Sequence, residues 1–118
     1  MARQTVDQMP FARVYPLLIA KAEKKGRTRA EVDTVTCWLT GYTPAELAGF
    51  LASDLTYGEF FARAPHPNEN AALIRGVVCG VRVEDLTDPL MQQVRRLDKL
   101  VDELAKGRPL EKILRRPE

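Results

Sequence analysis

The sequence predicts a mainly α-helical protein, a compact bundle of five to six helices. The first observation behind this is a Thr-x-x-Glu box that occurs three times, each time just before an apolar run. In such a box the threonine hydroxyl accepts a hydrogen bond from the N–H three residues on, and the glutamate accepts one from the threonine's own N–H. The second observation is a long C-terminal stretch with helical apolar spacing. The boxes are Thr28/Glu31, Thr43/Glu46 and Thr56/Glu59.

Length and composition indicate one globular domain over residues 1–118, with an ordered core of about 9–115. The chain is 45% hydrophobic and 29% charged, which is typical of soluble proteins and argues against disorder. We expect a cytoplasmic protein with no membrane association, because no apolar run approaches the roughly 20 residues that span a bilayer and no signal peptide is visible. Cys37 and Cys79 are therefore interpreted as reduced thiols.

The first four helices are predicted by their end signals. The N-terminal helix is expected to start near Pro16, or to be kinked there, because an interior proline removes a hydrogen bond. It ends at Gly26, which can take the left-handed conformation. The later helices are expected at about residues 29–40, 44–52 and 57–63, and residues 64–70 form a loop.

Residues 71–86 give conflicting signals. Apolar spacing favours a helix to about Cys79, followed by irregular chain or a short extended segment near Val81–Glu84. Gly76 and Gly80 weaken both interpretations.

Asp88 and Pro89 begin the longest predicted helix, which runs to Lys106. A short terminal helix over 110–114 follows. The long helix carries an apolar seam at alternating steps of four and three residues, and Lys99 and Glu103 are expected to pair across its other face. A small helical domain needs such a stripe for its own core, but a second copy of the chain could also cover part of it, so the seam is our candidate interaction surface. It comprises Leu90, Val94, Leu97, Val101 and Leu104.

The sequence offers no recognisable catalytic or metal-binding pattern. One histidine, His66, and two distant cysteines do not supply a zinc ligand spacing. A Cys-His nucleophilic pair would depend on spatial contacts that the spacing does not indicate. Gly76-x-x-x-Gly80 lacks the ending of a phosphate-binding loop. We therefore expect no metal, no cofactor and no catalytic residue.

Nucleic-acid binding is the third function class we consider, and we do not favour it. The helix pair around Thr40–Thr43 resembles a helix-turn-helix, but its second helix carries no Arg, Lys, Asn or Gln to contact bases. A basic run near the N-terminus could instead contact phosphates without sequence preference, although lysines at a helix end usually complement the helix dipole. This basic patch is Lys21, Lys24, Lys25, Arg27 and Arg29.

A small-molecule pocket is the second function class. Aromatic walls with one fixed cation suit an anionic organic ligand. The same residues equally suit a core whose polar tips are hydrogen-bonded. The candidate pocket residues are Tyr15, Trp38, Tyr42 and Arg82.

Many short blocks in order resemble the bacterial family domain of unknown function 2200 (DUF2200). They include Met9-Pro-Phe-Ala, Cys37-Trp-Leu-Thr-Gly-Tyr42, Cys79-Gly-Val-Arg-Val-Glu84 and Asp88-Pro-Leu-Met-Gln92. The resemblance runs from about Met9 to Leu114 and implies a stand-alone bacterial cytoplasmic protein. It brings no assigned activity, ligand or site residue.

Taken together, these observations favour a non-enzymatic helical module that self-associates, as a homodimer for example, or binds a macromolecular partner. The alternatives are a protein or enzyme with a pocket for a small anion, and non-specific nucleic-acid binding.

Overall fold

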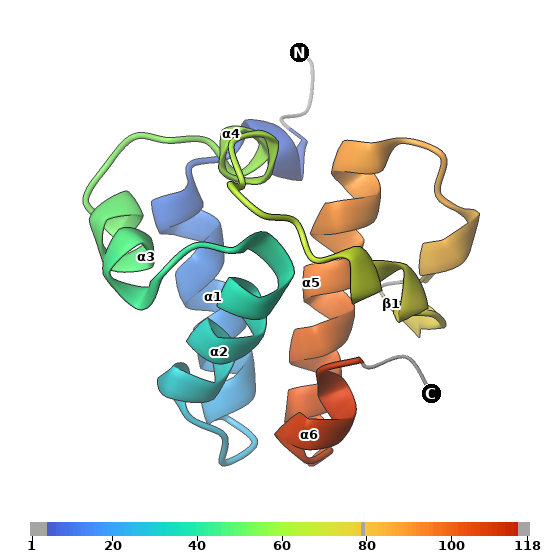
Figure 1. Ribbon diagram of the computed structural model, residues 1–118. Helices are drawn as coiled ribbons and strands as arrows, with labels where there is room; N and C mark the ends of the chain where they lie inside the picture. The colour runs from blue at the N-terminus through green and yellow to red at the C-terminus, as the bar shows by residue number, and fades with distance from the viewer. Residues whose placement is uncertain (1–4, 79, 116–118) are drawn as a thin grey trace.

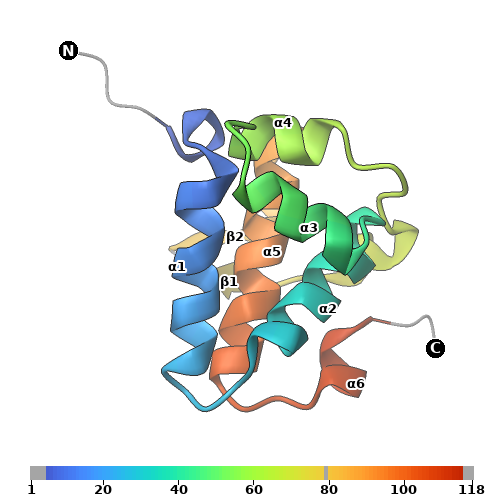
Figure 2. The same cartoon turned by 90° about the vertical axis from the view of Figure 1, so that its left-hand side faces the viewer.

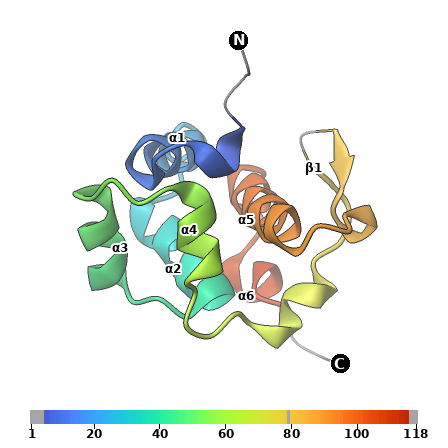
Figure 3. The ribbon, with the colours of Figure 1, turned by 90° about the horizontal axis from the view of Figure 1, so that it is seen from above.

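The computed structural model describes residues 5–78 and 80–115, and most of these are helical, as predicted (Figure 1). The central element is α5, which packs against α1, α2, α4 and α6 (Figures 1 and 3). Helix α3 lies against α1 and α2 at the outside of the bundle (Figure 2). The α-helices are α1 (Phe11–Glu23), α2 (Arg29–Thr40), α3 (Pro44–Leu51), α4 (Tyr57–Ala62), α5 (Pro89–Ala105) and α6 (Leu110–Ile113).

The three predicted capping boxes are confirmed. At the start of α2, the Thr28 N–H donates to Glu31 Oε1 at 3.0 Å and the Glu31 N–H donates to Thr28 Oγ1 at 3.2 Å. The same reciprocal bonds begin α3 and α4. Asp88 caps α5 by accepting from the Leu90 N–H at 3.0 Å. These starts depend only on local chemistry, which is why the sequence predicts them well.

Helix α1 begins earlier than predicted, at Phe11, and continues through Pro16. The start is set by tertiary contacts: the Phe11 N–H donates to the Leu55 carbonyl, and the Tyr57 N–H donates to the Met9 carbonyl, both at 2.8 Å. These bonds hold the segments before α1 and α4 side by side. The expected start near Pro16 is therefore wrong, since packing offsets the hydrogen bond that the proline removes.

Residues 71–78 do not form the predicted helix. The chain forms a 3-10 turn, then a two-stranded antiparallel hairpin in which Val78 pairs with Val81. Gly76 and Gly80 have φ of +110° and +76°, values that a right-handed helix excludes. The expected extended segment is confirmed only over its first two residues, and Cys79 lies outside the described residues. The elements are η2 (Glu69–Leu73), β1 (Val77–Val78), β2 (Val81–Arg82) and η3 (Val83–Asp85); a further turn, η1 (Val6–Gln8), precedes α1.

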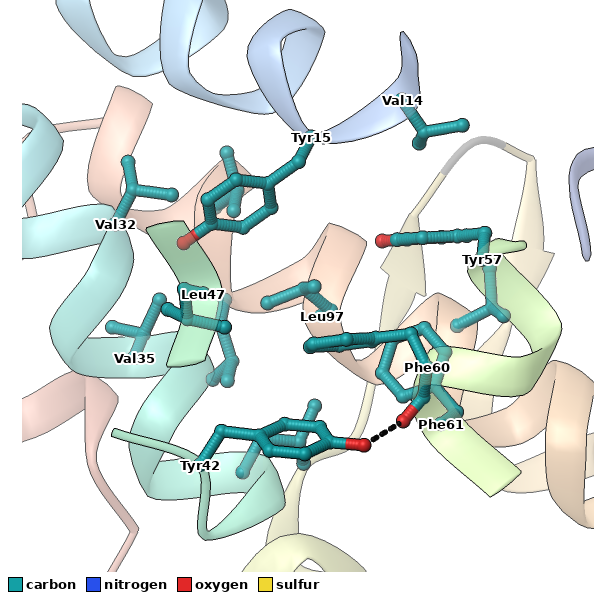
Figure 4. Packing of buried hydrophobic residues seen from close by; sticks show 14 of the residues in the cluster. Val14, Tyr15, Val32, Val35, Tyr42, Leu47, Tyr57, Phe60, Phe61 and Leu97 are labelled. Carbon is teal, nitrogen blue, oxygen red and sulfur yellow. Dashed lines mark hydrogen bonds between the residues drawn. The ribbon is translucent and has the colours of Figure 1, made fainter. Parts of the chain in front are cut away.

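The core joins the inner face of α5 to a cluster of aromatic side chains from α1, α4 and the turn after α2 (Figure 4). Phe60 is at its centre, with ring centroids 4.5 Å from Phe11 and 4.8 Å from Tyr42. Such contacts add to the free energy gained by burying apolar area. The cluster fixes α4 against the N-terminal half of α5, and this junction positions the site described below.

The C-terminal segment is held by an ion-pair cluster that the sequence did not predict. Glu103 is only 5% exposed and accepts from Arg115 at 2.6 Å and from Arg108 at 3.2 Å. Lys99, its expected partner, donates to the Val77 carbonyl at 3.3 Å. The predicted Lys99–Glu103 pair is therefore wrong, because the residues on either side of α6 bring closer cations to Glu103.

Candidate functional site

A cavity of about 400 Å³ opens between the N-terminal half of α5, the end of α4 and the loop that follows α4. Helix α5 contributes Pro89, Leu90, Gln92, Gln93 and Arg96 to its lining. These positions repeat at three- and four-residue steps, so they share one side of the helix. The opposite wall consists of Phe61, Ala62, Pro67 and Asn68.

Among the described residues that line this cavity, Arg96 is the one with a charged side chain. Its Nη1 donates to Gln93 Oε1 at 2.7 Å. Its Nε is buried and has no hydrogen-bond partner. No carboxylate of the described residues lies within ion-pair distance of it, whereas the neighbouring Arg95 pairs with Asp98 at 3.0 Å. Burial lowers the pKa of Arg96 somewhat from its usual value, but arginine stays charged at neutral pH.

The loop wall of the cavity is tied to the C-terminal end of α2. The His66 N–H donates to the Thr40 carbonyl at 3.1 Å, and the Asn68 N–H donates to the Leu39 carbonyl at 3.0 Å. The Asn68 side-chain amide donates to the Trp38 carbonyl at 3.1 Å. These bonds satisfy carbonyls that the last turn of a helix leaves unpaired. Asn68 therefore positions the loop.

The remaining polar groups of the cavity are mostly donors. Gln92 makes no side-chain hydrogen bond to the rest of the described chain, and Gln93 uses its oxygen for Arg96, which leaves its amide N–H groups available. Two prolines, Leu90 and Phe61 supply apolar walls. The cavity also lies beside the first turns of α5, where the helix dipole favours negative charge. A cation and amide donors between apolar walls suit an anion that carries an apolar body.

The four residues predicted to form a pocket do not come together. The Tyr15 hydroxyl is buried and donates to Asp33 at 2.7 Å, and the Tyr42 hydroxyl donates to the Phe60 carbonyl at 2.7 Å. Trp38 is partly buried at the edge of the core. The hairpin of β1 and β2 lies on the other side of α5 from α2 (Figure 3). Arg82 is on β2, and its exposed guanidinium pairs with Glu84 and Asp85. The two tyrosines are core residues whose hydroxyls are hydrogen-bonded, as in the second of the two interpretations given to these residues.

Most of the apolar seam is inside the chain's own core. Its four later members, from Val94 to Leu104, are at most 1% exposed. Leu90 is partly buried and lines the cavity instead. This burial matches the first of the two roles considered for the seam, which is to form the core of the chain's own domain.

Three of the five residues in the basic patch already face acidic groups. Arg27 Nε donates to Glu31 at 2.9 Å, and the same guanidinium donates to the carbonyls of Leu104 and Arg108. Lys21 lies 3.5 Å from Asp102, and Arg29 lies 3.7 Å from Asp33. Lys24 and Lys25 are exposed at the end of α1. The patch therefore offers less free positive charge than its sequence suggests.

The described residues give little support for a metal site, for a reactive cysteine or for a membrane-spanning helix. They contain no group of three or more potential metal ligands. Cys37 borders a second cavity with Asp33, and burial together with nearby Asp33 and Glu46 raises the pKa of its thiol, which disfavours the reactive thiolate. His66 is exposed. Within the same residues, no helix combines the length and apolar character needed to cross a membrane.

Sequence reasoning missed Arg96, Gln92, Gln93 and Phe61 as site residues. The sequence nevertheless contained a signal that could have indicated Arg96. Arg96 has glutamines three and four residues before it and Lys99 three residues after it, so no acid is within reach along the helix. An arginine on a helix that faces a neighbouring element without such a partner is worth attention as a ligand contact.

Comparisons with known proteins agree with this fold. A solved structure titled "Crystal structure of uncharacterized protein SP1917" is 49% identical, with a TM-score of 0.90, over 96% of this chain and 93% of that one. A comparison with curated proteins returned no match. The model of DUF2200, a family described as uncharacterised proteins conserved in bacteria, matches residues 5–115. The chain therefore belongs to the DUF2200 family.

Proposed function

We propose that this protein binds a small organic anion with an apolar body in the cavity between α4, α5 and residues 64–68. The observation that carries the proposal is the Arg96 guanidinium, which borders an apolar-walled cavity without an acidic partner among the described residues. A volume of about 400 Å³ falls within the range typical of small-molecule sites.

The energetic argument starts from the charge of Arg96. Its Nη1 donates to a neutral amide oxygen, and no carboxylate of the described residues lies within ion-pair distance of the guanidinium. A hydrogen bond to a charged group contributes about 1.5–3 kcal/mol, more than a bond between neutral groups. An anion in the cavity would give Arg96 such a partner, and contact with Phe61 and Leu90 would add hydrophobic free energy.

This proposal is for binding and not for catalysis. The side chains that line the cavity are aliphatic, aromatic, amide and guanidinium groups, without a carboxylate, imidazole, thiol or hydroxyl that could act as nucleophile or general base. It retains the non-enzymatic role expected from the sequence and the anionic ligand of the second function class, but at different residues. Self-association through the seam has less support, because most of the seam is core.

Protein-observed NMR with a library of small organic acids tests the proposal. We expect some acids to shift the amide signals of Gln92, Gln93 and Asn68. The shifts should disappear in Arg96→Gln and persist in Arg13→Gln, which loses the same charge from an exposed position on α1. The proposal fails if no acid shifts the cavity signals, or if Arg96→Gln binds as well as the wild-type protein.

A further inference from the structure

We infer that residues 108–115 form a strap that holds the loop wall of the cavity in place, fastened to α5 by the ion pair between Arg115 and Glu103. The strap contacts the wall through a hydrogen bond from Asn70 to the Arg115 carbonyl. The inference goes beyond the proposed function, because the strap acts on the wall with or without a ligand. Only its effect on ligand binding rests on that function.

The end of the strap is fixed by a bidentate ion pair. Arg115 Nη1 donates to Glu103 Oε1 at 2.6 Å, and Arg115 Nη2 donates to Glu103 Oε2 at 2.7 Å. Only 13% of the Arg115 side chain and 6% of the Glu103 side chain are exposed. Two parallel charge-assisted bonds fix the orientation of both groups. The same Nη1 also donates to the carbonyl of the fully buried Ile113 at 2.7 Å, so the guanidinium holds its own backbone in place.

Asn70 joins the strap to the cavity wall. Its side-chain amide donates to the Arg115 carbonyl at 3.4 Å, its one side-chain hydrogen bond within the described residues. Its backbone N–H donates to Oδ1 of Asn68, a cavity-lining residue, at 2.8 Å. Asn68 also donates to carbonyls at the end of α2. The wall is therefore attached to α2 on one side and to the strap on the other.

A wall with two attachments opens less often than a wall with one, because local opening must break every contact that crosses it. The bond from Asn70 to the strap is long and joins neutral groups, so its loss should raise the opening of the wall about two- to fivefold. A ligand that contacts Pro67 or Asn68 would stabilise the same closed wall. The strap and the ligand would therefore favour one conformation of the loop.

Amide hydrogen exchange without ligand tests the strap. The reporters are the His66 and Asn68 N–H groups, which donate to carbonyls of α2. Asn70→Ala removes the link and leaves the buried ion pair intact, so it should speed exchange at both reporters about two- to fivefold. Arg115→Met should also speed exchange, but should add nothing in the Asn70→Ala background, because both changes break the same attachment.

Arg108→Met is the matched control. Arg108 donates to the same Glu103 carboxylate at 3.2 Å but makes no hydrogen bond to the loop within the described residues, so loop exchange should stay at the wild-type rate. Unchanged exchange in Asn70→Ala would overturn the strap. An equal effect of Arg108→Met and Arg115→Met would overturn it too, since this would indicate a general loosening. Asn70→Ala decides the question even if Arg115→Met does not fold.

Benzoate, an organic acid with an apolar body, links the strap to the proposed function. At about nine times its dissociation constant, benzoate should slow exchange at His66 and Asn68 about tenfold, because it binds the closed wall. Benzoate that shifts the Gln92 and Gln93 signals but leaves this exchange unchanged would overturn the shared closed wall. If neither benzoate nor any acid of the library shifts those signals, the binding function fails, and the strap is decided by the variants alone.

Discussion

Gly41 lies directly against His66: a Cβ placed on Gly41 would be 2.7 Å from His66 Cβ and 2.9 Å from the His66 backbone nitrogen. Gly41 has φ of +85° and ends α2, and His66 belongs to the loop that forms one wall of the cavity. The end of α2 and the cavity wall are therefore in contact through a position where only glycine fits.

Gly41→Ala should destabilise the protein and move the cavity wall. Alanine at φ +85° costs about 1–2 kcal/mol, and the overlap with His66 should add about 1–3 kcal/mol. Gly26→Ala is the matched control, since Gly26 has the same φ but open space around it, and should show the conformational cost alone. Urea unfolding measures both, and equal losses in the two variants would contradict the contact.

Leu97→Ala should cost about 2–5 kcal/mol of unfolding free energy, because Leu97 is fully buried within the chain. Leu17→Ala, at a position 63% exposed, should change it by about 0.5 kcal/mol or less. Light scattering run beside the unfolding experiment tests the seam as an interface. A small loss of stability with a fall in solution mass would place Leu97 between subunits.

Arg96→Met should leave the protein as stable as the wild type or raise its unfolding free energy by about 1 kcal/mol, because methionine removes a buried donor that has no partner. Arg95→Met should instead lose stability, since Arg95 is paired with the partly buried Asp98. Thermal unfolding without added ligand compares the two. A clear loss in Arg96→Met would mean that the guanidinium stabilises the fold by more than its hydrogen bond to Gln93.

Acid should destabilise the protein partly through Glu31. Its hydrogen bonds with Arg27 and with the Thr28 N–H hold the pKa of its carboxyl below its usual value. A carboxyl with a lowered folded-state pKa contributes stability that is present above its ordinary pKa and lost as pH falls through the folded value. Asp98 acts in the opposite direction, because burial raises its pKa.

Glu31→Gln isolates this contribution, since glutamine can keep the capping box but does not titrate. Its unfolding free energy should fall less steeply than that of the wild type between neutral pH and about pH 3. Glu111→Gln, at an exposed position in α6, is the control. Parallel curves for the wild type and Glu31→Gln would show that Glu31 does not contribute.

The fold was predictable where a few neighbouring residues decide the structure. The threonine boxes, Asp88 and the closing glycines are local devices, and they placed α2, α3, α4 and α5 closely. The prediction failed where the structure depends on contacts between segments that are distant in sequence, or on backbone angles. Pairing with residues 55–57 starts α1 before Pro16, and the hairpin follows from backbone angles at Gly76 and Gly80 that apolar spacing does not reveal.

The candidate site was harder to predict than the fold. Aromatic residues near one cation are a reasonable sign of a pocket, but Tyr15 and Tyr42 find acceptors inside the core. What marks Arg96 is the lack of an acidic partner among the described residues, and this becomes visible only once α4 and the loop are placed against α5. Its lack of an acidic neighbour along the helix was the one part of this evidence that the sequence contained.

The most direct test of the account follows the side-chain amide signals of Gln92 and Gln93 during a titration with organic acids that carry an apolar body. Both glutamines line the cavity with Arg96. We predict that these signals move progressively in the wild-type protein and stay in place in Arg96→Gln. Signals that stay in place in the wild-type protein, or that move equally in Arg96→Gln, would contradict the proposed site.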